Sequence, residues 1–168
     1  MVETFKKIEG FENYSVSDHG NVRNDQTGII LQGRATRGYL QVGLMANKKR
    51  NFKYIHKLTA EAFLENPENK KCVDHIDNDR QNNNLINLRF ATSQENSQNS
   101  KLSSKNTSGA KGVRWQKGQN RWRAEITING KLIYLGSFIN KDDAINIRIE
   151  RAKDEFGEFI NKCELIIN

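Results

Sequence analysis

The residues with the clearest chemical potential lie in a polar stretch in the middle of the chain, where Asp74 and His75 are neighbours. Adjacent residues on a strand point to opposite sides, so these two side chains can be aimed at adjacent places. A helix packed across the same element can bring the amide of Asn96 opposite Asp74. One carboxylate and one amide oxygen leave positions for water and phosphate around an octahedral cation, which favours Mg²⁺ or Mn²⁺ over zinc.

His75 is the candidate general base beside such a cation, because an imidazole titrates near neutral pH and can take a proton from water. A metal ion and a base at a phosphodiester would make a hydrolase. The competing interpretation is an inert hairpin in which Asp74 and His75 only stabilise a turn. Asp77 and Asp79 are expected to shape the loop by bonding backbone groups, and a role near the metal is the alternative.

Two short strands and a helix must position these groups. The runs Cys72–His75 and Leu88–Ala91 predict strands on either side of an Asp- and Asn-rich loop at 77–84. Thr92, followed three residues later by Glu95, forms a capping box that predicts the start of a polar helix. The predicted order is therefore strand, loop, strand, helix.

The first 52 residues predict a small β-rich module of short strands and turns. Ile55, Leu58 and Ala62 then fall at the spacing of one helix face. His56 lies at the start of this helix and is expected to be structural or to contact a phosphate.

The C-terminal part has the strongest secondary-structure signal, because Asn129 and Gly130 form the preferred two-residue turn of a β-hairpin. That turn also fixes which residues of the two strands lie opposite each other. The predicted pairs are Ile128 with Lys131, Ile126 with Ile133, Glu125 with Tyr134 and Ala124 with Leu135. Alternation then predicts one apolar face and one charged face for the sheet.

A helix is expected over residues 141–156, with Asn140 as its N-cap and Gly157 as its C-terminal stop. Its apolar stripe can cover the apolar face of the sheet, which leaves the face that carries Arg121 and Arg123 exposed. An ordinary solvated surface is the alternative for these arginines. Residues 101–109 are rich in Ser, Asn and Lys and predict a flexible linker ahead of the sheet.

The chain has 168 residues, enough for one ordinary domain or two to three small modules, and a formal net charge of +7. Two basic regions flank residues 72–100, which hold two basic and four acidic residues. This pattern favours a polyanionic partner, with a solvated basic surface as the alternative. We find no membrane span, secretory signal or CxxC motif, so we expect a cytoplasmic protein without a disulfide framework, in a bacterial host cell if a phage encodes it.

Residues 54–99 resemble the HNH nuclease family, whose ββα-metal motif is a strand, a loop, a strand and a helix. The matching segments, in the family's order and spacing, are 73–75, 87–89, 91–92 and 95–96. The resemblance implies that Asp74 and Asn96 bind the metal and that His75 is the base. It also implies that Asn87, counted among the catalytic residues, holds the loop by hydrogen bonds to the backbone. Asn96 replaces the histidine usual in the family, as in a variant common among phage homing nickases.

The flanking regions resemble two DNA-binding modules. Residues 7–17 and 38–40 look like the N-terminal module that precedes this motif in homing endonucleases, and residues from 112 to 152 are similar to the Apetala/ethylene-response-factor type DNA-binding domain. In that family a three-stranded sheet enters the major groove, where arginine contacts guanine or phosphate and glutamate accepts from cytosine. The residues expected to contact DNA are Arg34, Arg37, Lys48, Lys49, Arg50, Arg89, Arg114, Arg121, Arg123, Glu125 and Tyr134.

Together these features predict an α+β protein of small modules. They are a β-rich DNA-contact module (1–52), an HNH nuclease (53–100), the linker (101–109), and a three-stranded antiparallel sheet packed on one helix (110–168). The predicted function is a site-specific homing-type DNA endonuclease, a monomer that uses one Mg²⁺ or Mn²⁺ ion to nick double-stranded DNA. The alternative is a DNA-binding transcriptional regulator with a decayed nuclease motif, although Asp74 and His75 are intact. A defence nuclease would use the same chemistry.

Overall fold

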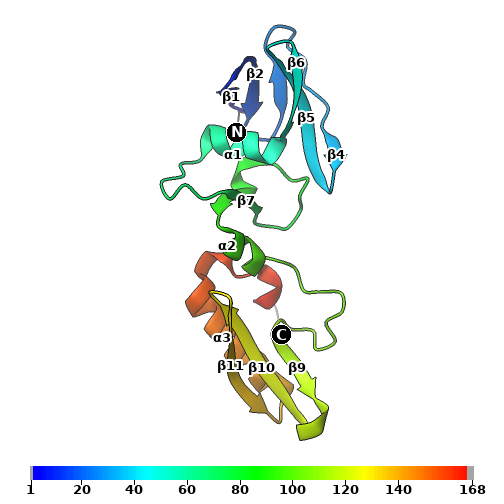
Figure 1. Ribbon diagram of the computed structural model, residues 1–168, viewed down its shortest axis with the longest axis vertical. Coiled ribbons are helices and arrows are strands. Elements are labelled where there is room, and N and C mark those ends of the chain that lie inside the picture. The colour runs from blue at the N-terminus through cyan, green and yellow to red at the C-terminus, as the bar shows by residue number, and fades with distance from the viewer. Residues whose placement is uncertain (1, 166–168) are drawn as a thin grey trace. The chain divides into compact units, whose positions relative to one another are not determined.

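The computed structural model describes residues 2–165, and the chain divides into two compact units between Ser93 and Gln94 (Figure 1). We call residues 1–93 the N-terminal unit and residues 94–168 the C-terminal unit. Both combine helices with antiparallel strands, which confirms the predicted α+β class. Within the described part of the chain, no helix is both long and apolar enough to span a bilayer.

Two three-stranded antiparallel sheets and one helix form most of the N-terminal unit. The sheets have the strand orders β1-β2-β3 and β4-β5-β6. Their strands are β1 (Phe5–Ile8), β2 (Phe11–Ser17), β3 (Val22–Asn24), β4 (Arg34–Thr36), β5 (Tyr39–Ala46) and β6 (Lys49–Tyr54). Helix α1 (Ile55–Phe63) contacts both sheets and buries Ile55 and Leu58 in their common core, as the helical spacing predicts (Figure 1).

A two-stranded hairpin carries the candidate catalytic residues. β7 (Cys72–His75) pairs with β8 (Leu88–Ala91) in an antiparallel ladder, with the bounds predicted from the sequence. The loop between them ends in a short 3₁₀ helix, η1 (Leu85–Asn87). The Leu85 N–H donates to the Asp18 carbonyl of the N-terminal module at 2.8 Å, and α1 contacts both strands. The first module therefore supports the hairpin as well as carrying basic residues.

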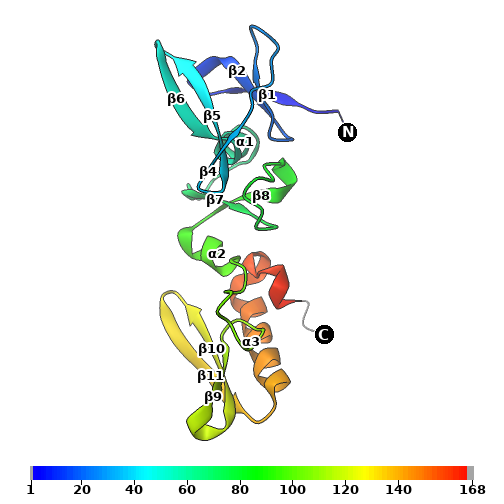
Figure 2. The same cartoon turned by 90° about the vertical axis from the view of Figure 1, so that its right-hand side faces the viewer.

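The C-terminal unit is a three-stranded antiparallel sheet with a helix along one face (Figure 2). Its elements are β9 (Val113–Gln116), η2 (Lys117–Gln119), β10 (Arg121–Ile128), β11 (Lys131–Phe138), α3 (Lys141–Phe156), η3 (Gly157–Phe159) and η4 (Lys162–Glu164). The sheet order is β11-β10-β9, and Ala124 and Ile126 are buried on the side that α3 covers. The bounds of α3 and its cap at Gly157 agree with the prediction, whereas Asn140 makes no side-chain capping bond.

The register of the β10–β11 hairpin follows the prediction near the turn and departs from it farther along. The two turn residues have positive φ, and pairing out to Glu125 with Tyr134 is as expected. A β-bulge between Ala124 and Glu125 then pairs Ala124 with Gly136, so the predicted pairing with Leu135 is wrong. A bulge inserts one extra residue into a strand, and the alternation of side chains gives no means of locating it.

Residues 99–112, which include the predicted linker, contain no helix or strand. The Asn106 side chain donates to the Ala110 carbonyl at 2.9 Å. Lys111 Nζ donates to the Gln98 carbonyl at 3.0 Å, which brings the two ends of the segment together. Polar side chains of this segment therefore bond backbone groups of the same loop.

Gly112 provides a test of how this loop joins the sheet. Its φ is +65°, and a Cβ atom there would lie 2.1 Å from the carbonyl oxygen of Glu125. We predict that Gly112→Ala lowers the free energy of unfolding by about 2 kcal/mol or more, because a backbone clash adds to the strain of positive φ. Urea unfolding followed by circular dichroism measures the change.

Gly118→Ala is the matched control, since a Cβ atom at Gly118 would meet no heavy atom within 4 Å. Its effect should stay below about 1 kcal/mol. Equal losses in the two variants would contradict the account of Gly112.

Candidate active site and nucleic-acid interface

Asp74 lies opposite Arg89 in the β7–β8 ladder, and both side chains are largely buried. The Arg89 guanidinium donates to Oδ2 of Asp74 from Nε at 3.0 Å and from a terminal nitrogen at 2.9 Å. A buried carboxylate without a cation beside it is costly, so this pairing stabilises Asp74 where it lies. Arg89, which we expected to contact DNA, can do so only by exchanging or sharing this partner.

His75 is buried, and its Nε2 lies 3.3 Å from Oδ1 of Asn83. Because Nδ2 of Asn83 donates to the Gln81 carbonyl at 3.1 Å, the amide oxygen is the atom that faces the imidazole. Nε2 then carries the proton and donates it, which places the lone pair of the neutral ring on Nδ1. Burial lowers the pKa of His75, against the opposing effects of Asn83 and three nearby aspartates, so the basic form is present at neutral pH.

Asn87 closes the loop that follows His75. Its Nδ2 donates to Oδ1 of Asp77 at 2.8 Å and to the Asn82 carbonyl at 2.9 Å, and its Oδ1 accepts from the Asp77 N–H at 3.0 Å. These are the loop-holding bonds expected of Asn87, whose part in catalysis stays a prediction. Asp77 also accepts from the Asp79 N–H at 2.7 Å. Burial alone would raise the pKa of Asp77, but its hydrogen bonds outweigh burial and lower it.

A cluster of aromatic rings packs against His75. The ring centroid of His56 lies 5.0 Å from those of His75 and Tyr39. Burial, with smaller contributions from the charges of His75 and Lys57, lowers the pKa of His56 to about 3. Nδ1 of His56 is buried without a hydrogen-bond partner among residues 2–165. His56 is therefore a neutral, structural ring, which is one of the two roles expected for it.

Sequence analysis did not single out Asn83 or Tyr39. Asn83 is one of three successive asparagines, and nothing in the sequence indicates which of them faces His75. Tyr39 was visible only as part of an extended run, although its ring lies 5.9 Å from that of His75 and beneath the Arg80 guanidinium. Asn83 reaches His75 through the path of the loop, and Tyr39 reaches it from another segment, so no local pattern reports either contact.

Asn96 lies in α2 (Ser93–Gln98), with its side chain exposed. Asp74 belongs to the N-terminal unit and Asn96 to the C-terminal unit, so their convergence on one cation stays a prediction. In the described chain, no three or more His, Cys, Asp or Glu side chains gather in an arrangement that could hold a metal ion. The predicted donors are a carboxylate and an amide oxygen, and this hard-oxygen chemistry fits Mg²⁺ or Mn²⁺.

The basic residues predicted to contact DNA in the first module share one sheet. Arg34 lies on β4, Arg37 in the β4–β5 turn, Lys48 in the β5–β6 turn, and Lys49 and Arg50 on β6. All five are exposed, with Arg34 and Arg37 toward the β4–β5 turn and Lys48, Lys49 and Arg50 toward the β5–β6 turn.

The uncovered face of the C-terminal sheet carries a connected set of charged and aromatic groups. Glu125 accepts from Nε of Arg114 at 3.1 Å and from Nε of Arg123 at 2.6 Å, and the Arg123 guanidinium lies 4.9 Å from the Tyr134 ring centroid. Burial alone would raise the pKa of Glu125, but the two arginines outweigh burial and lower it. Arg121 is exposed on the same strand. Glu125 therefore orients two arginines, and its direct contact with a base stays a prediction.

Two family models match the first part of the chain. A NUMOD4 motif matches residues 3–45, and an HNH endonuclease model matches residues 53–98, the span that contains Asp74, His75, Asn87 and Asn96. Over residues 53–98 the chain is therefore similar to the HNH endonuclease family. The NUMOD4 match coincides with the β-rich module predicted to precede the HNH motif.

Proteins similar to this chain occur in a virus and in a phage. The chain is 45% identical over 94 residues to an HNH endonuclease of Acanthamoeba polyphaga mimivirus, and 35% identical over 97 residues to DNA endonuclease I-HmuI of Bacillus phage SP01. These matches cover 54% and 56% of the chain but only 24% and 56% of the relatives, so the chain spans about a quarter to half of their length.

A solved structure extends the similarity beyond the HNH motif. The structure entitled "DNA binding and cleavage by the HNH homing endonuclease I-HmuI" aligns with a TM-score of 0.54 and 28% identity. The alignment covers 92% of this chain and 83% of that one, so the C-terminal unit is largely included.

The buried pair of histidines predicts a pH-dependent stability. Between pH 6.5 and about 3 the unfolded His56 binds a proton that the native state does not, so stability is lost as the pH falls below 6.5. We predict that the free energy of unfolding falls by about 2 kcal/mol less in His56→Leu than in wild type when the pH is lowered from 7 to 5. Urea unfolding at the two pH values measures the difference. His19→Leu, at a half-exposed histidine, should keep the wild-type slope. The same slope in wild type and His56→Leu would exclude His56 as its source.

Proposed function

We propose that the chain is a site-specific DNA endonuclease of homing type that hydrolyses one phosphodiester of a duplex at the β7–β8 hairpin. The observation that carries this proposal is the state of His75, a buried neutral imidazole whose Nε2 bonds Asn83 and whose lone pair is on Nδ1. That arrangement suits a general base, because Asn83 orients the ring and holds the proton on Nε2, so that the neutral imidazole can accept a proton at Nδ1.

In the proposed reaction, Nδ1 of His75 accepts a proton from water, and the water oxygen attacks phosphorus in line with the 3′-oxygen. The bond from phosphorus to the 3′-oxygen breaks, and that oxygen takes a proton from solvent. The products are a 5′-phosphate and a 3′-hydroxyl. Asn83 holds the ring during the transfer, and Asn87 holds the loop on which Asn83 lies.

We assign Asp74 and Asn96 as the residues that would hold a divalent cation, Mg²⁺ or Mn²⁺. Such a cation would supply positive charge to the phosphate and to the leaving oxygen as negative charge develops on them. The Arg89 guanidinium, 2.9 Å from Asp74, is a positive group beside this carboxylate that could move to a phosphate.

Two surfaces would bind the DNA duplex. The β4-β5-β6 sheet offers exposed positive charge to phosphates, and the uncovered face of the C-terminal sheet offers Arg114, Arg121, Arg123 and Tyr134. We propose that this second sheet reads the major groove in the manner of the Apetala/ethylene-response-factor domains that its sequence resembles.

One active site per chain favours a monomer that nicks one strand. The intact Asp74 and His75 argue against a decayed, purely regulatory protein.

Plasmid nicking tests the reaction. Purified protein with Mg²⁺ or Mn²⁺ and supercoiled plasmid that contains the target region should give open circles, and His75→Ala should slow this conversion by about 100-fold or more. His19→Ala is the matched control and should nick like the wild type. Equal nicking by His75→Ala and wild type would remove His75 from the mechanism, and DNA binding without nicking would favour the regulator.

Salt-dependent binding tests the C-terminal surface. Arg121→Ala should weaken binding to target duplex and reduce the slope of log K against log salt by about 1, because one phosphate contact is lost. Arg151→Ala is the control, since Arg151 lies on α3 and pairs with Glu155. A slope unchanged by Arg121→Ala, measured by fluorescence anisotropy, would contradict a phosphate contact of Arg121.

A further inference from the structure

The short helix that carries Asn96 is fixed by residues far along the chain in the C-terminal unit. α2 ends at Gln98, whose carbonyl accepts from Nζ of Lys111 at 3.0 Å. A lysine ammonium at the last carbonyls of a helix is favourable, because these carbonyls carry a partial negative charge and lack partners within the helix.

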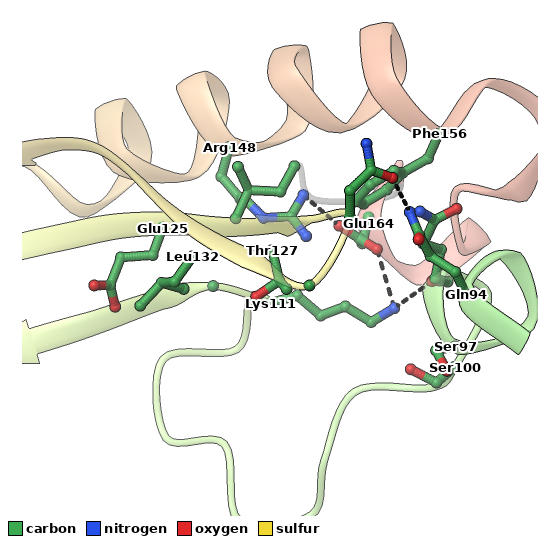
Figure 3. Close-up of a pocket in the computed structure, with 15 residues that line it drawn as sticks. Gln94, Ser97, Ser100, Lys111, Glu125, Thr127, Leu132, Arg148, Phe156 and Glu164 are labelled. Carbon is green, nitrogen blue, oxygen red and sulfur yellow. Dashed lines mark hydrogen bonds and ion pairs between the residues drawn. The ribbon is translucent and has the colours of Figure 1, made fainter.

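Lys111 is held in turn by a buried chain of charges. Its Nζ lies 3.0 Å from one oxygen of Glu164, whose other oxygen lies 3.0 Å from the Arg148 guanidinium (Figure 3). The Glu164 and Arg148 side chains are only 4% and 8% exposed. Arg148 belongs to α3, so these ion pairs connect the end of α2 to the helix that packs on the C-terminal sheet.

A second buried contact fixes the residue that follows α2. Asn161 Nδ2 donates to both the backbone carbonyl and the side-chain oxygen of Asn99. Oδ1 of Asn161 accepts from the Cys163 N–H at 3.0 Å, which fixes the orientation of the amide. Asn99 and Asn161 are both buried.

The other end of α2 is tied as well, since the Gln94 side chain donates to Oδ1 of Asn129 at 2.9 Å (Figure 3). A helix of six residues with no buried side chain is too short to be stable by itself. These contacts therefore support its conformation. Buried charges such as Glu164 and Arg148 are also costly unless their partners are in place, which makes the arrangement specific.

We infer that Lys111 and Asn161 are positioning residues of the nuclease: through α2 they fix the direction of Asn96. This inference rests on the proposed function of Asn96 as a metal ligand. The C-terminal unit would then have two tasks, since the same fold that presents arginines to DNA also holds the helix of the cleavage motif. Removal of either contact should loosen α2 while leaving the arginine surface intact.

Hydrogen exchange tests the structural part without any need for activity. In Lys111→Met, the amide of Asn99, which bonds the Glu95 carbonyl, should exchange at least tenfold faster than in wild type. The amides paired between β10 and β11 should keep their wild-type rates. Lys117→Met, at an exposed lysine in η2, is the control and should leave both sets unchanged.

Asn161→Asp is the second variant, because it keeps the acceptor for the Cys163 N–H and replaces the donor that faces Asn99 with an oxygen. It should also loosen α2 alone. Unchanged exchange at Asn99 in both variants would overturn the inference, as would equal acceleration in the β10–β11 amides, which would indicate a general loss of folding.

Metal titration of plasmid nicking tests the functional part. Lys111→Met should raise the Mg²⁺ concentration for half-maximal nicking several-fold and leave the affinity for DNA without metal unchanged, and Lys111→Arg should restore the wild-type value. A loss of DNA affinity with an unchanged Mg²⁺ requirement would overturn the positioning role. If the wild type nicks no DNA, the proposed function fails, while the exchange result still decides whether these residues fix α2.

Discussion

The carboxamide of Asn87 closes the loop between β7 and β8, and the placement of the reactive groups depends on that closure. Its three hydrogen bonds join Asp77 and Asn82 to Asn87, which directly precedes β8. The closed loop carries Asn83 to the imidazole of His75, and this bond selects the tautomer of the ring. The Asn87 side chain can make all three bonds because its amide has two N–H donors and one oxygen acceptor. The groups that it bonds are backbone and carboxylate atoms of the same loop.

Burial and charge divide the histidines and carboxylates of this region into distinct roles. His56 and His75 pack ring to ring and are both neutral at pH 7, because burial lowers the pKa of each imidazole. Asp74 is buried and pairs with Arg89, whereas the Asp77 carboxylate accepts hydrogen bonds within the loop. The region therefore places a neutral imidazole next to a carboxylate that is paired with Arg89.

The similarity to I-HmuI extends over most of the chain, although the HNH and NUMOD4 matches stop at residue 98. The physical reason for a long chain is visible in α2, which has too few residues to be stable alone and takes its support from Lys111 and Asn161. A nuclease motif of this size needs neighbours, and here the neighbours also carry the basic surfaces that suit DNA.

The sequence by itself determined the elements whose signals are local. The strands of the hairpin, α1, α3 and the turn at Asn129 follow from alternation, helical spacing and turn chemistry, all of which act within a few residues. Metal-dependent phosphodiester hydrolysis was predicted from the adjacent Asp74 and His75 and from their spacing to Asn87. The tertiary structure decided the rest: the bulge at Ala124, the hydrogen bonds of the loop before β9, the partner of His75 and the pairing of Glu125 with two arginines. Those features depend on the path of each loop and on how neighbouring strands pair, and composition or periodicity cannot report which of several similar side chains fills such a contact.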